Sequence, residues 1–353
     1  MFEDLIVVDC STVLAGPSVG TFFAESGASV FKIENPAIPD VTRSWKLASE
    51  DKNTPISAYF SSVNYRKLYQ KLDFKNPGDR DELLELVKGA DIFLSNFKKG
   101  DAEKFGLTDA ILHSINPRLI IGKISGFGTE SDRVAYDLIL QAETGFMSMN
   151  GTPESGPVKM PVALIDVLAA HQLKEGILTA LLQRTKTNTG KTVSVSLYDA
   201  AICSLANQAS NYLMEHHTPE RIGSLHPNIA PYGEIFTTKD GKPITFAIGS
   251  NKHFELLCGF LGLSELVSDE RFATNVNRVT NRTTLEKLIQ ERIMQHPADE
   301  IMEYMHKKFV PAGRIKDLEE VFSSPESQKL VRTEQIEHTN TKRVSQIAFQ
   351  FES

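Results

Sequence analysis

LIVVDCSTVLAGPSVGTFFAESGASVFKIE, residues 5–34, is the stretch that decides the fold. It contains a β-rich run over 5–10, a turn-like Ala-Gly-Pro, an apolar helix that ends at Gly27, and a second β-rich run over 28–34. This order predicts a β–α–β unit, in which a helix joins two parallel strands.

The same alternation continues through the first two hundred residues. After a basic segment at 63–78, the pattern predicts a helix over 80–90, a strand over 90–97, a helix over 107–117 and a strand over 118–128. A long helix is then expected over 167–184, and residues 191–208 read as a strand that leads into a helix. We therefore expect an α/β fold with a parallel sheet and helices on both faces.

The second half of the chain has a different pattern. A stretch rich in Pro, His and Asn, residues 209–231, reads as a linker. A hairpin turned by Asp240-Gly241 is expected over 234–249, followed by helices over 251–308 and a β-like tail over 344–351. These features predict a second, smaller α+β domain.

The bulk composition is typical of a soluble globular protein with more than one domain: 353 residues, of which 41% are hydrophobic and 24% charged. The net charge of −7 disfavours a nucleic-acid partner, and we find no run long enough for a membrane span and no signal peptide. Three widely spaced cysteines, Cys10, Cys203 and Cys258, argue against disulfides and favour a cytoplasmic location.

Several ligand motifs are absent. The first β–α turn lacks Gly-x-Gly-x-x-Gly and carries Pro17 where a backbone donor would be needed, which disfavours a nicotinamide enzyme. Gly190-Lys191-Thr192 lacks the earlier glycine of a phosphate loop. No histidine or cysteine spacing is typical of a metal site, so we expect no metal.

Two basic clusters could hold an anion. The first is Arg66, Lys67, Lys71 and Lys75, and the second is Lys98, Lys99 and Lys104. Such runs are often only a solvated face. The alternative is that both clusters face one ligand with several phosphates, because loops after parallel strands are where ligands bind.

Two further features follow strands or begin helices. Ser125-Gly126-Phe127-Gly128 is either a plain turn or a place where a ligand approaches the backbone. Asp166 lies in the apolar run VALIDVL, just before the long helix, and the spacing predicts a helix N-cap. A cap would stabilise the carboxylate as an anion, and such an anion can act as a nucleophile toward an activated carbonyl.

An ordered set of segments resembles the family III CoA-transferases, the CaiB–BaiF group that includes formyl-CoA transferase and the 2-methylacyl-CoA racemases. The matching segments are Leu14-Ala15-Gly16-Pro17, Val30-Phe31-Lys32-Ile33-Glu34, Asn64-Tyr65-Arg66-Lys67, Leu72-Asp73, Ser95-Asn96-Phe97, Ile124-Ser125-Gly126-Phe127-Gly128, Tyr136-Asp137, Asp166, Pro231-Tyr232, Lys239-Asp240-Gly241, Arg271-Phe272 and Pro311-Ala312-Gly313.

The resemblance implies a Rossmann-like large domain over 1–208, the linker 209–231, a small domain over 232–313, and a return segment over 314–353 that packs on the large domain. It further implies a ring-shaped chain and an interlocked homodimer. Coenzyme A or acyl-CoA would be a substrate, with no prosthetic group. The residues implied to bind it are Ala15, Leu72, Lys75, Asn96, Phe97, Lys104, Gly126, Phe127 and Tyr136.

The implied reaction transfers coenzyme A from a donor acyl-CoA to an acceptor carboxylate through a covalent intermediate on Asp166. A racemase that moves a proton at the α-carbon is one alternative. In that branch a His-Asp pair stands where this chain has Tyr136-Asp137, and tyrosine, with a pKa near 10, is a poor base at neutral pH. A non-catalytic protein that only binds CoA or acyl-CoA is the other alternative.

Overall fold

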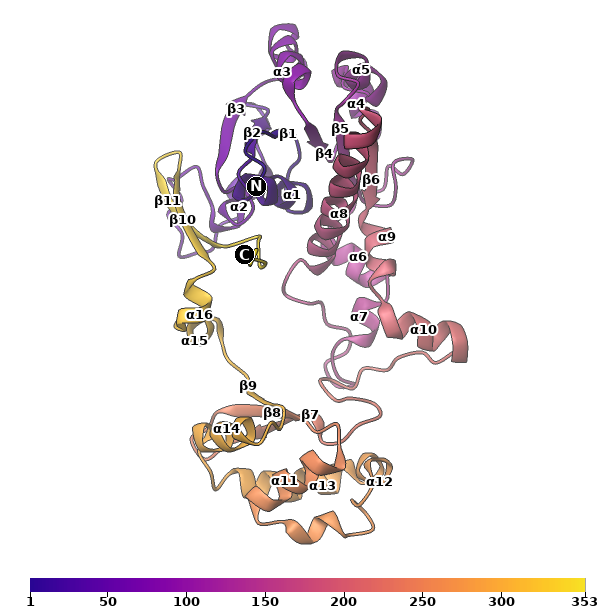
Figure 1. Ribbon diagram of the computed structural model, residues 1–353, viewed down its shortest axis with the longest axis vertical. Helices are drawn as coiled ribbons and strands as arrows, with labels where there is room; N and C mark the ends of the chain where they lie inside the picture. The colour runs from indigo at the N-terminus through magenta and orange to yellow at the C-terminus, as the bar shows by residue number, and fades with distance from the viewer. Residues whose placement is uncertain (353) are drawn as a thin grey trace. The chain divides into compact units, whose positions relative to one another are not determined.

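The computed structural model describes residues 1–352, which form two compact units. The first unit contains Met1–Met147, Lys159–Pro219 and the chain from Gln328. The second contains Ser148–Val158 and Glu220–Ser327. The chain therefore leaves the first unit and later comes back to it (Figure 1).

A six-stranded parallel sheet forms the centre of the first unit, in the order β3-β2-β1-β4-β5-β6. Its strands are β1 (Ile6–Asp9), β2 (Ser29–Glu34), β3 (Lys67–Lys71), β4 (Ile92–Ser95), β5 (Ile120–Ser125) and β6 (Thr192–Ser196). This is the order of a dinucleotide-binding Rossmann sheet. The parallel sheet predicted from the alternation of strands and helices is confirmed.

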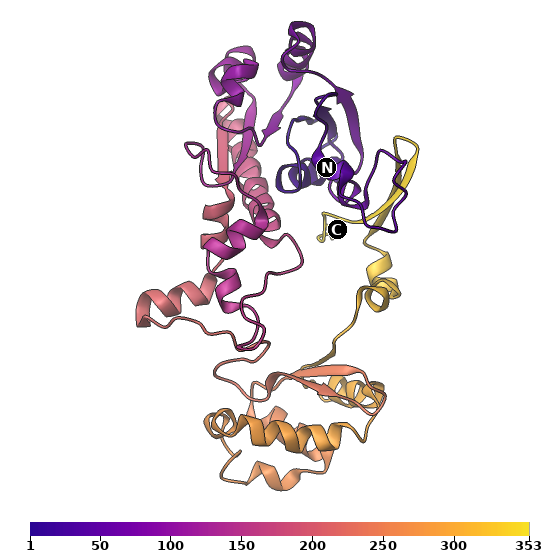
Figure 2. The same cartoon turned by 180° about the vertical axis from the view of Figure 1, so that it is seen from behind.

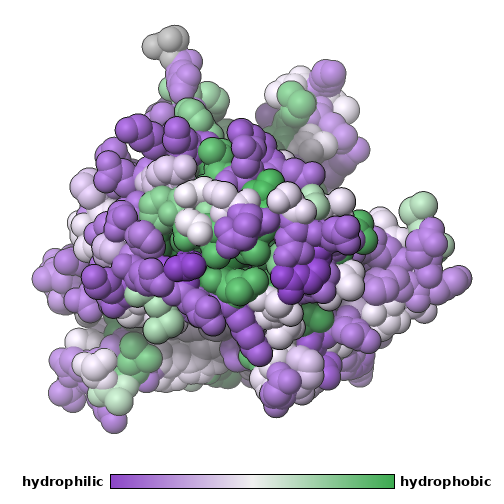
Figure 3. Space-filling view, turned by 90° about the horizontal axis from the view of Figure 1, so that it is seen from below, coloured by the Kyte–Doolittle hydropathy of each residue, from purple (hydrophilic) through white to green (hydrophobic). Residues whose placement is uncertain are grey.

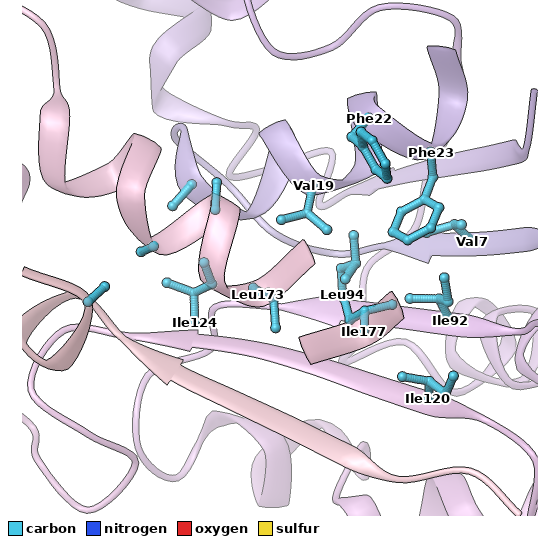
Figure 4. Close-up of a cluster of buried hydrophobic side chains, with 14 of the residues drawn as sticks. Val7, Val19, Phe22, Phe23, Ile92, Leu94, Ile120, Ile124, Leu173 and Ile177 are labelled. Atoms are coloured by element: carbon cyan, nitrogen blue, oxygen red, sulfur yellow. The ribbon is translucent and has the colours of Figure 1, made fainter. Parts of the chain in front are cut away.

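Helices cover both faces of this sheet because its central strands are apolar on both sides. On one face α1 (Ala15–Glu25), α8 (Leu164–Thr187) and α9 (Leu197–Cys203) pack on Val7, Ile92 and Ile120 (Figure 4). On the other face α3 (Pro77–Gly89) and α5 (Asp109–Ile115) pack on the next residue of each strand, Val8, Phe93 and Ile121. Side chains of one strand alternate between the two cores, as the pleat requires.

The first unit contains further elements. They are η1 (Val41–Ser44), α2 (Ala58–Ser61), α4 (Asp101–Phe105), α6 (Asp137–Glu143), α10 (Ala206–Glu215), β10 (Val331–Ile336) and β11 (Thr339–Val344). Two more, α7 (Phe146–Met149) and α16 (Pro325–Gln328), cross the limits between the units. The hairpin β10–β11 lies beside α2, as Figures 1 and 2 both show.

Strand β3 was missed in the sequence, where residues 63–78 appeared only as a basic segment. Its residues KLYQK carry too little apolar character to predict a strand. It pairs with β2 alone, at the edge of the sheet, where polar and charged residues are tolerated.

The second unit has its own sheet and core. The antiparallel order β7-β8-β9 joins β7 (Tyr232–Thr237), β8 (Pro243–Ala247) and β9 (Ala312–Arg314). The predicted hairpin is confirmed, with Gly241 at φ +74° in its turn. Around the sheet lie α11 (Asn251–Leu261), η2 (Ser264–Val267), α12 (Asn275–Thr280), α13 (Arg282–Ile293) and α14 (Ala298–Lys307). Helix α15 (Leu318–Phe322) follows β9 and lies beside α16, away from the sheet (Figure 1).

The limits of the two units differ in detail from the expected domain limits. Ser148–Val158 groups with the second unit, because the Gly223 N–H donates to the Gly151 carbonyl at 2.8 Å and Arg221 donates to the Ser148 carbonyl at 3.0 Å. The β-like tail expected over 344–351 is wrong beyond Val344. There the backbone N–H of Gln346 donates to the Glu25 carboxylate, at 2.9 Å, instead of to a neighbouring strand.

The molecular surface seen in Figure 3 is largely hydrophilic, with a few apolar residues grouped near its middle. In the part of the chain that the structure describes, no helix combines the length and the apolar character needed to cross a bilayer.

Candidate active site

A pocket of about 840 Å³ lies at the carboxyl edge of the parallel sheet, and all of its lining residues belong to the first unit. Its walls include the segments that follow β1, β2, β4 and β5, together with the first turn of α8. A pocket at this edge is where open α/β sheets bind their ligands.

Six of the predicted site residues line this pocket: Ala15, Asn96, Phe97, Gly126, Tyr136 and Asp166. Four others lie outside its lining. Leu72 is buried in the core beneath α3, and Phe127 lies under the Arg133 guanidinium, 3.8 Å from the ring centre. Lys75 is exposed, and the Lys104 ammonium is 3.9 Å from the Asp101 carboxylate.

Of the two basic clusters, Lys98 and Lys99 line the pocket and Lys67 belongs to the core. Lys67 is fully buried, and its ammonium is 2.8 Å from the Asp9 carboxylate. A lysine held in this way is part of the core and is unavailable to phosphates. In the second cluster, Lys98 and Lys99 do line the pocket.

Two further cations of the pocket were missed in the sequence. Lys123 lies near the end of β5, 2.5 Å from Asp109, and Arg133 lies 2.6 Å from Glu143. Lys123 falls within the predicted strand 118–128, so a lysine near its carboxyl end was a usable signal. Arg133 lies in a loop with no such signal.

In the loop Ser125-Gly126-Phe127-Gly128, Gly126 lets two segments of the chain pack closely together. A Cβ atom at Gly126 would lie 2.2 Å from the Ala135 side chain, so only glycine fits there. Its carbonyl accepts from the Tyr198 N–H at 3.0 Å. Gly126 thereby brings the segment ending at Tyr136 against the end of β5.

Asp166 is not the N-cap of α8. The helix begins at Leu164 with Ala163 at the cap position, and no side chain of the cap residue bonds to it. The backbone N–H of Ile165, in the first turn, donates instead to the carboxylate of Asp137 at 2.7 Å. Asp137 lies 28 residues before Ile165 in the chain. Asp166 lies in the first turn of α8, and its side chain does not cap the helix.

The carboxyl group of Asp166 is also not held as an anion. The residue is 8% exposed, and burial together with the charge of Asp137 raises its pKa to about 7. Within residues 1–352 its carboxylate makes neither an ion pair nor a side-chain hydrogen bond that would offset this cost. An acid with a pKa near neutrality in a pocket is typical of functional sites.

Two aromatic residues near Asp166 were missed in the sequence. Burial and the charges of Asp166 and Asp137 raise the pKa of Tyr59 to about 12, so its hydroxyl remains a hydrogen-bond donor beside these carboxylates. The Trp45 ring lies 5.1 Å from that of Tyr59 and 6.5 Å from that of Tyr136. No local pattern in the sequence points to either residue.

The parallel sheet and the pocket of about 840 Å³ at its carboxyl edge define an α/β protein with room for a large ligand. The family model described as "CoA-transferase family III" matches residues 2–353, and the chain belongs to this family. It is therefore a CoA-transferase, an enzyme class that uses acyl-CoA as a substrate.

Curated relatives and a solved structure agree with this assignment. The chain is 35% identical to a succinate–glutarate CoA-transferase from Agrobacterium fabrum, over 91% of this chain and 82% of the relative. It is 34% identical to an acetyl-CoA:oxalate CoA-transferase from Acetobacter aceti, over 92% and 83%. A crystal structure of a CaiB/BaiF family protein from Brucella suis matches it with a TM-score of 0.86 and 35% identity, over 98% of this chain and 91% of that one.

Proposed function

We propose that the protein moves coenzyme A from a donor acyl-CoA to an acceptor carboxylate, with Asp166 as the covalent nucleophile. The observation that carries this proposal is a buried carboxyl group, free of hydrogen-bond partners among the described residues, in a pocket that also holds Lys98 and Lys99. A weakly solvated carboxylate can attack an activated carbonyl.

The proposed reaction begins when the Asp166 carboxylate attacks the thioester carbonyl of the donor. The C–S bond breaks, and a mixed anhydride and the CoA thiolate form. The thiolate then attacks the aspartyl carbonyl and the donor acid leaves, which produces an aspartyl-CoA thioester. The acceptor carboxylate repeats both steps in reverse, so that the new acyl-CoA leaves and Asp166 is a free carboxylate again.

The proposed roles of the other residues follow their place in the pocket. Lys98 and Lys99, at its rim, would attract the phosphates of coenzyme A, while Ala15, Asn96, Phe97, Gly126 and Tyr136 would line the path to Asp166. Leu72, Lys75, Lys104 and Phe127 stay predictions from the resemblance. The protonated Tyr59 hydroxyl can donate to the oxyanion that forms at each step.

We propose short dicarboxylates and their CoA esters as substrates, because the relatives named above act on succinate, glutarate and oxalate. The test is incubation of the protein with succinyl-CoA and a set of carboxylates, followed by mass spectrometry of the CoA esters and of the protein. New esters and an adduct on Asp166 are expected, and Asp166→Ala abolishes both.

The matched control is Glu175→Gln, an exposed acid on the same helix, which retains full exchange. Exchange that persists in Asp166→Ala would refute the nucleophile. Exchange of substrate α-deuterium with water, without CoA transfer, would favour the racemase. Tight CoA binding with neither reaction would favour a binding protein.

We also propose that two chains form a homodimer, interlocked as the resemblance implies. Three apolar side chains of α10, those of Tyr212, Leu213 and Met214, are 52%, 74% and 75% exposed, which supports a partner that covers them. Light scattering is expected to give twice the chain mass, and Leu213→Glu with Met214→Glu to give monomers. Interlocked tagged and untagged dimers would form hybrids only after unfolding, so rapid hybrid formation would exclude interlocking.

A further inference from the structure

The turn between β1 and α1 forms one wall of the pocket through Thr12, Val13 and Leu14. Val13 adopts φ +74°, in the left-handed region. A β-branched residue rarely adopts this conformation, because its Cβ substituents crowd the backbone. The surrounding structure must hold the turn in place.

Asp40 holds the centre of this turn. One oxygen of its carboxylate accepts from the Val13 N–H at 3.1 Å. The other oxygen accepts from the backbone N–H and the hydroxyl of Thr42, at 3.0 and 2.7 Å. The two oxygens therefore tie the turn to η1, whose first residue, Val41, also lines the pocket.

A buried lysine completes the arrangement. The Lys32 ammonium lies 3.7 Å from the Asp40 carboxylate and donates to the carbonyl of Ser11, at the start of the turn. The side chains of Lys32 and Asp40 have no exposed surface. Burying an ion pair costs free energy, because both charges lose their hydration. The pair of Lys32 and Asp40 connects the 11–14 turn to the 38–41 wall, so it can fix the geometry of both.

Asp40 does not line the pocket itself, but residues next to it in the chain do. Ile38, Pro39 and Val41 belong to the lining, and Asp40 does not. Its backbone N–H donates to the Glu34 carboxylate at 3.0 Å, which fixes the 38–41 wall to the end of β2. Asp40 thus connects the 11–14 turn, η1 and the end of β2 at the carboxyl edge of the parallel sheet.

We propose that Asp40, supported by Lys32, is a positioning residue that clamps the 11–14 turn and the 38–41 wall in the geometry needed for CoA transfer. This inference rests on the proposed function. Asp40 acts through the turn on the substrate and makes no contact with it.

The test is Asp40→Asn, compared with Asp91→Asn. An asparagine offers one carbonyl oxygen and cannot accept from both Val13 and Thr42. Asp91 is a matched control, because its carboxylate also accepts a backbone N–H, from Ile6 at 2.9 Å, and pairs with the buried Arg184 at 2.8 Å. It lies before β4, at the edge of the sheet away from the pocket.

For Asp40→Asn we expect kcat of CoA transfer to fall at least about tenfold, since a small misplacement of a substrate has effects of this size. The KM for acyl-CoA should change less, because Lys98 and Lys99 are untouched. The amides of residues 11–14 should exchange faster with deuterium. Asp91→Asn should change neither kcat nor this exchange.

A rescue separates positioning from general destabilisation. Glycine adopts a positive φ without strain, so Val13→Gly in the Asp40→Asn background should restore most of the lost kcat, relative to Val13→Gly alone. If Asp40→Asn does not fold, Asp40→Glu keeps the charge beside Lys32 and displaces the acceptor oxygens; it should show the same loss of kcat, and Asp91→Glu should not.

Equal kcat and equal exchange of the turn in the Asp40 and Asp91 variants would overturn the inference, as would a failure of Val13→Gly to restore activity. A wild-type protein without CoA transfer would overturn the proposed function instead. The deuterium exchange of residues 11–14 would still decide whether Asp40 holds the turn.

Discussion

Ionising the carboxyl group of Asp166 costs more in the folded chain than in the unfolded one. The residue is 8% exposed and faces the charge of Asp137, and together these raise its pKa from an ordinary 3.8 to about 7. The folded state therefore binds a proton that the unfolded state has released between these two pH values. Stability is lost as the pH rises through this range.

Asp166→Asn should accordingly stabilise the protein at pH 8, by up to about 4 kcal/mol, because asparagine imitates the protonated acid at every pH. The gain should shrink as the pH falls and be nearly absent at pH 4. Urea unfolding of both proteins at several pH values measures it. A constant difference between pH 4 and pH 8 would contradict the raised pKa of Asp166.

Asp137→Asn should lower the pKa of Asp166, since it removes the nearby negative charge but leaves an oxygen that accepts from Ile165. The midpoint of the pH dependence of kcat/KM should move to lower pH, while burial keeps it above the ordinary value. Glu175→Gln, which removes an exposed acid of α8, is the control and should leave the midpoint unchanged.

The residue scale is also where the sequence misled most. The spacing predicted that Asp166 caps α8, but the carboxylate that accepts from the first turn of this helix is that of Asp137. Lys67 sits in a basic segment and looked like a surface residue, yet its ammonium is paired with Asp9 in the core. Both errors have one cause: contacts between distant parts of the chain leave no mark in local spacing.

At the scale of elements, the local pattern was a better guide. The central strands β1, β4 and β5 are mostly buried and rich in apolar residues, so they were predicted close to their observed limits. The edge strand β3 is only partly buried and was missed. Most pocket residues lie in segments directly after predicted strands, but the six site residues that line the pocket were expected from the resemblance to the family.

Helix α8 packs so closely on β6 that one of its residues must lack a side chain. A Cβ atom at Gly176 would lie 2.5 Å from Val193. Gly176→Ala should therefore destabilise the protein by about 1–3 kcal/mol, although alanine is the better helix former. The free energy of unfolding in urea measures this change.

Gly89, the last residue of α3, is the control for Gly176, because a side chain at this position has free space. A Cβ atom there meets nothing within 4 Å. Gly89→Ala should be neutral or stabilise by up to about 1 kcal/mol. A gain of stability in Gly176→Ala would show that α8 can move away from the sheet.

At the scale of the whole molecule, the two units have separate hydrophobic cores. Leu257 in α11 and Leu94 in β4 are both fully buried, each in its own core. Either residue changed to alanine should lower stability by about 2–5 kcal/mol. Leu257→Ala should speed deuterium exchange in residues 220–327 and leave the parallel sheet protected, whereas Leu94→Ala should do the reverse. Equal loss of protection in both units would mean that they unfold together.

Within residues 1–352 the hairpin β10–β11 is the last regular element, and it belongs to the same unit as the first residues of the chain. Ile336 fills a small cluster with Ile56 and Phe60, and Arg343 pairs with the buried Glu25. A ribosome makes a protein from its amino end, so the second unit, continuous from Glu220 to Ser327, is available for folding before the hairpin has been synthesised. The nascent first unit stays incomplete until the hairpin has been synthesised, with Glu25 unpaired and the side chains of Ile56 and Phe60 uncovered by Ile336.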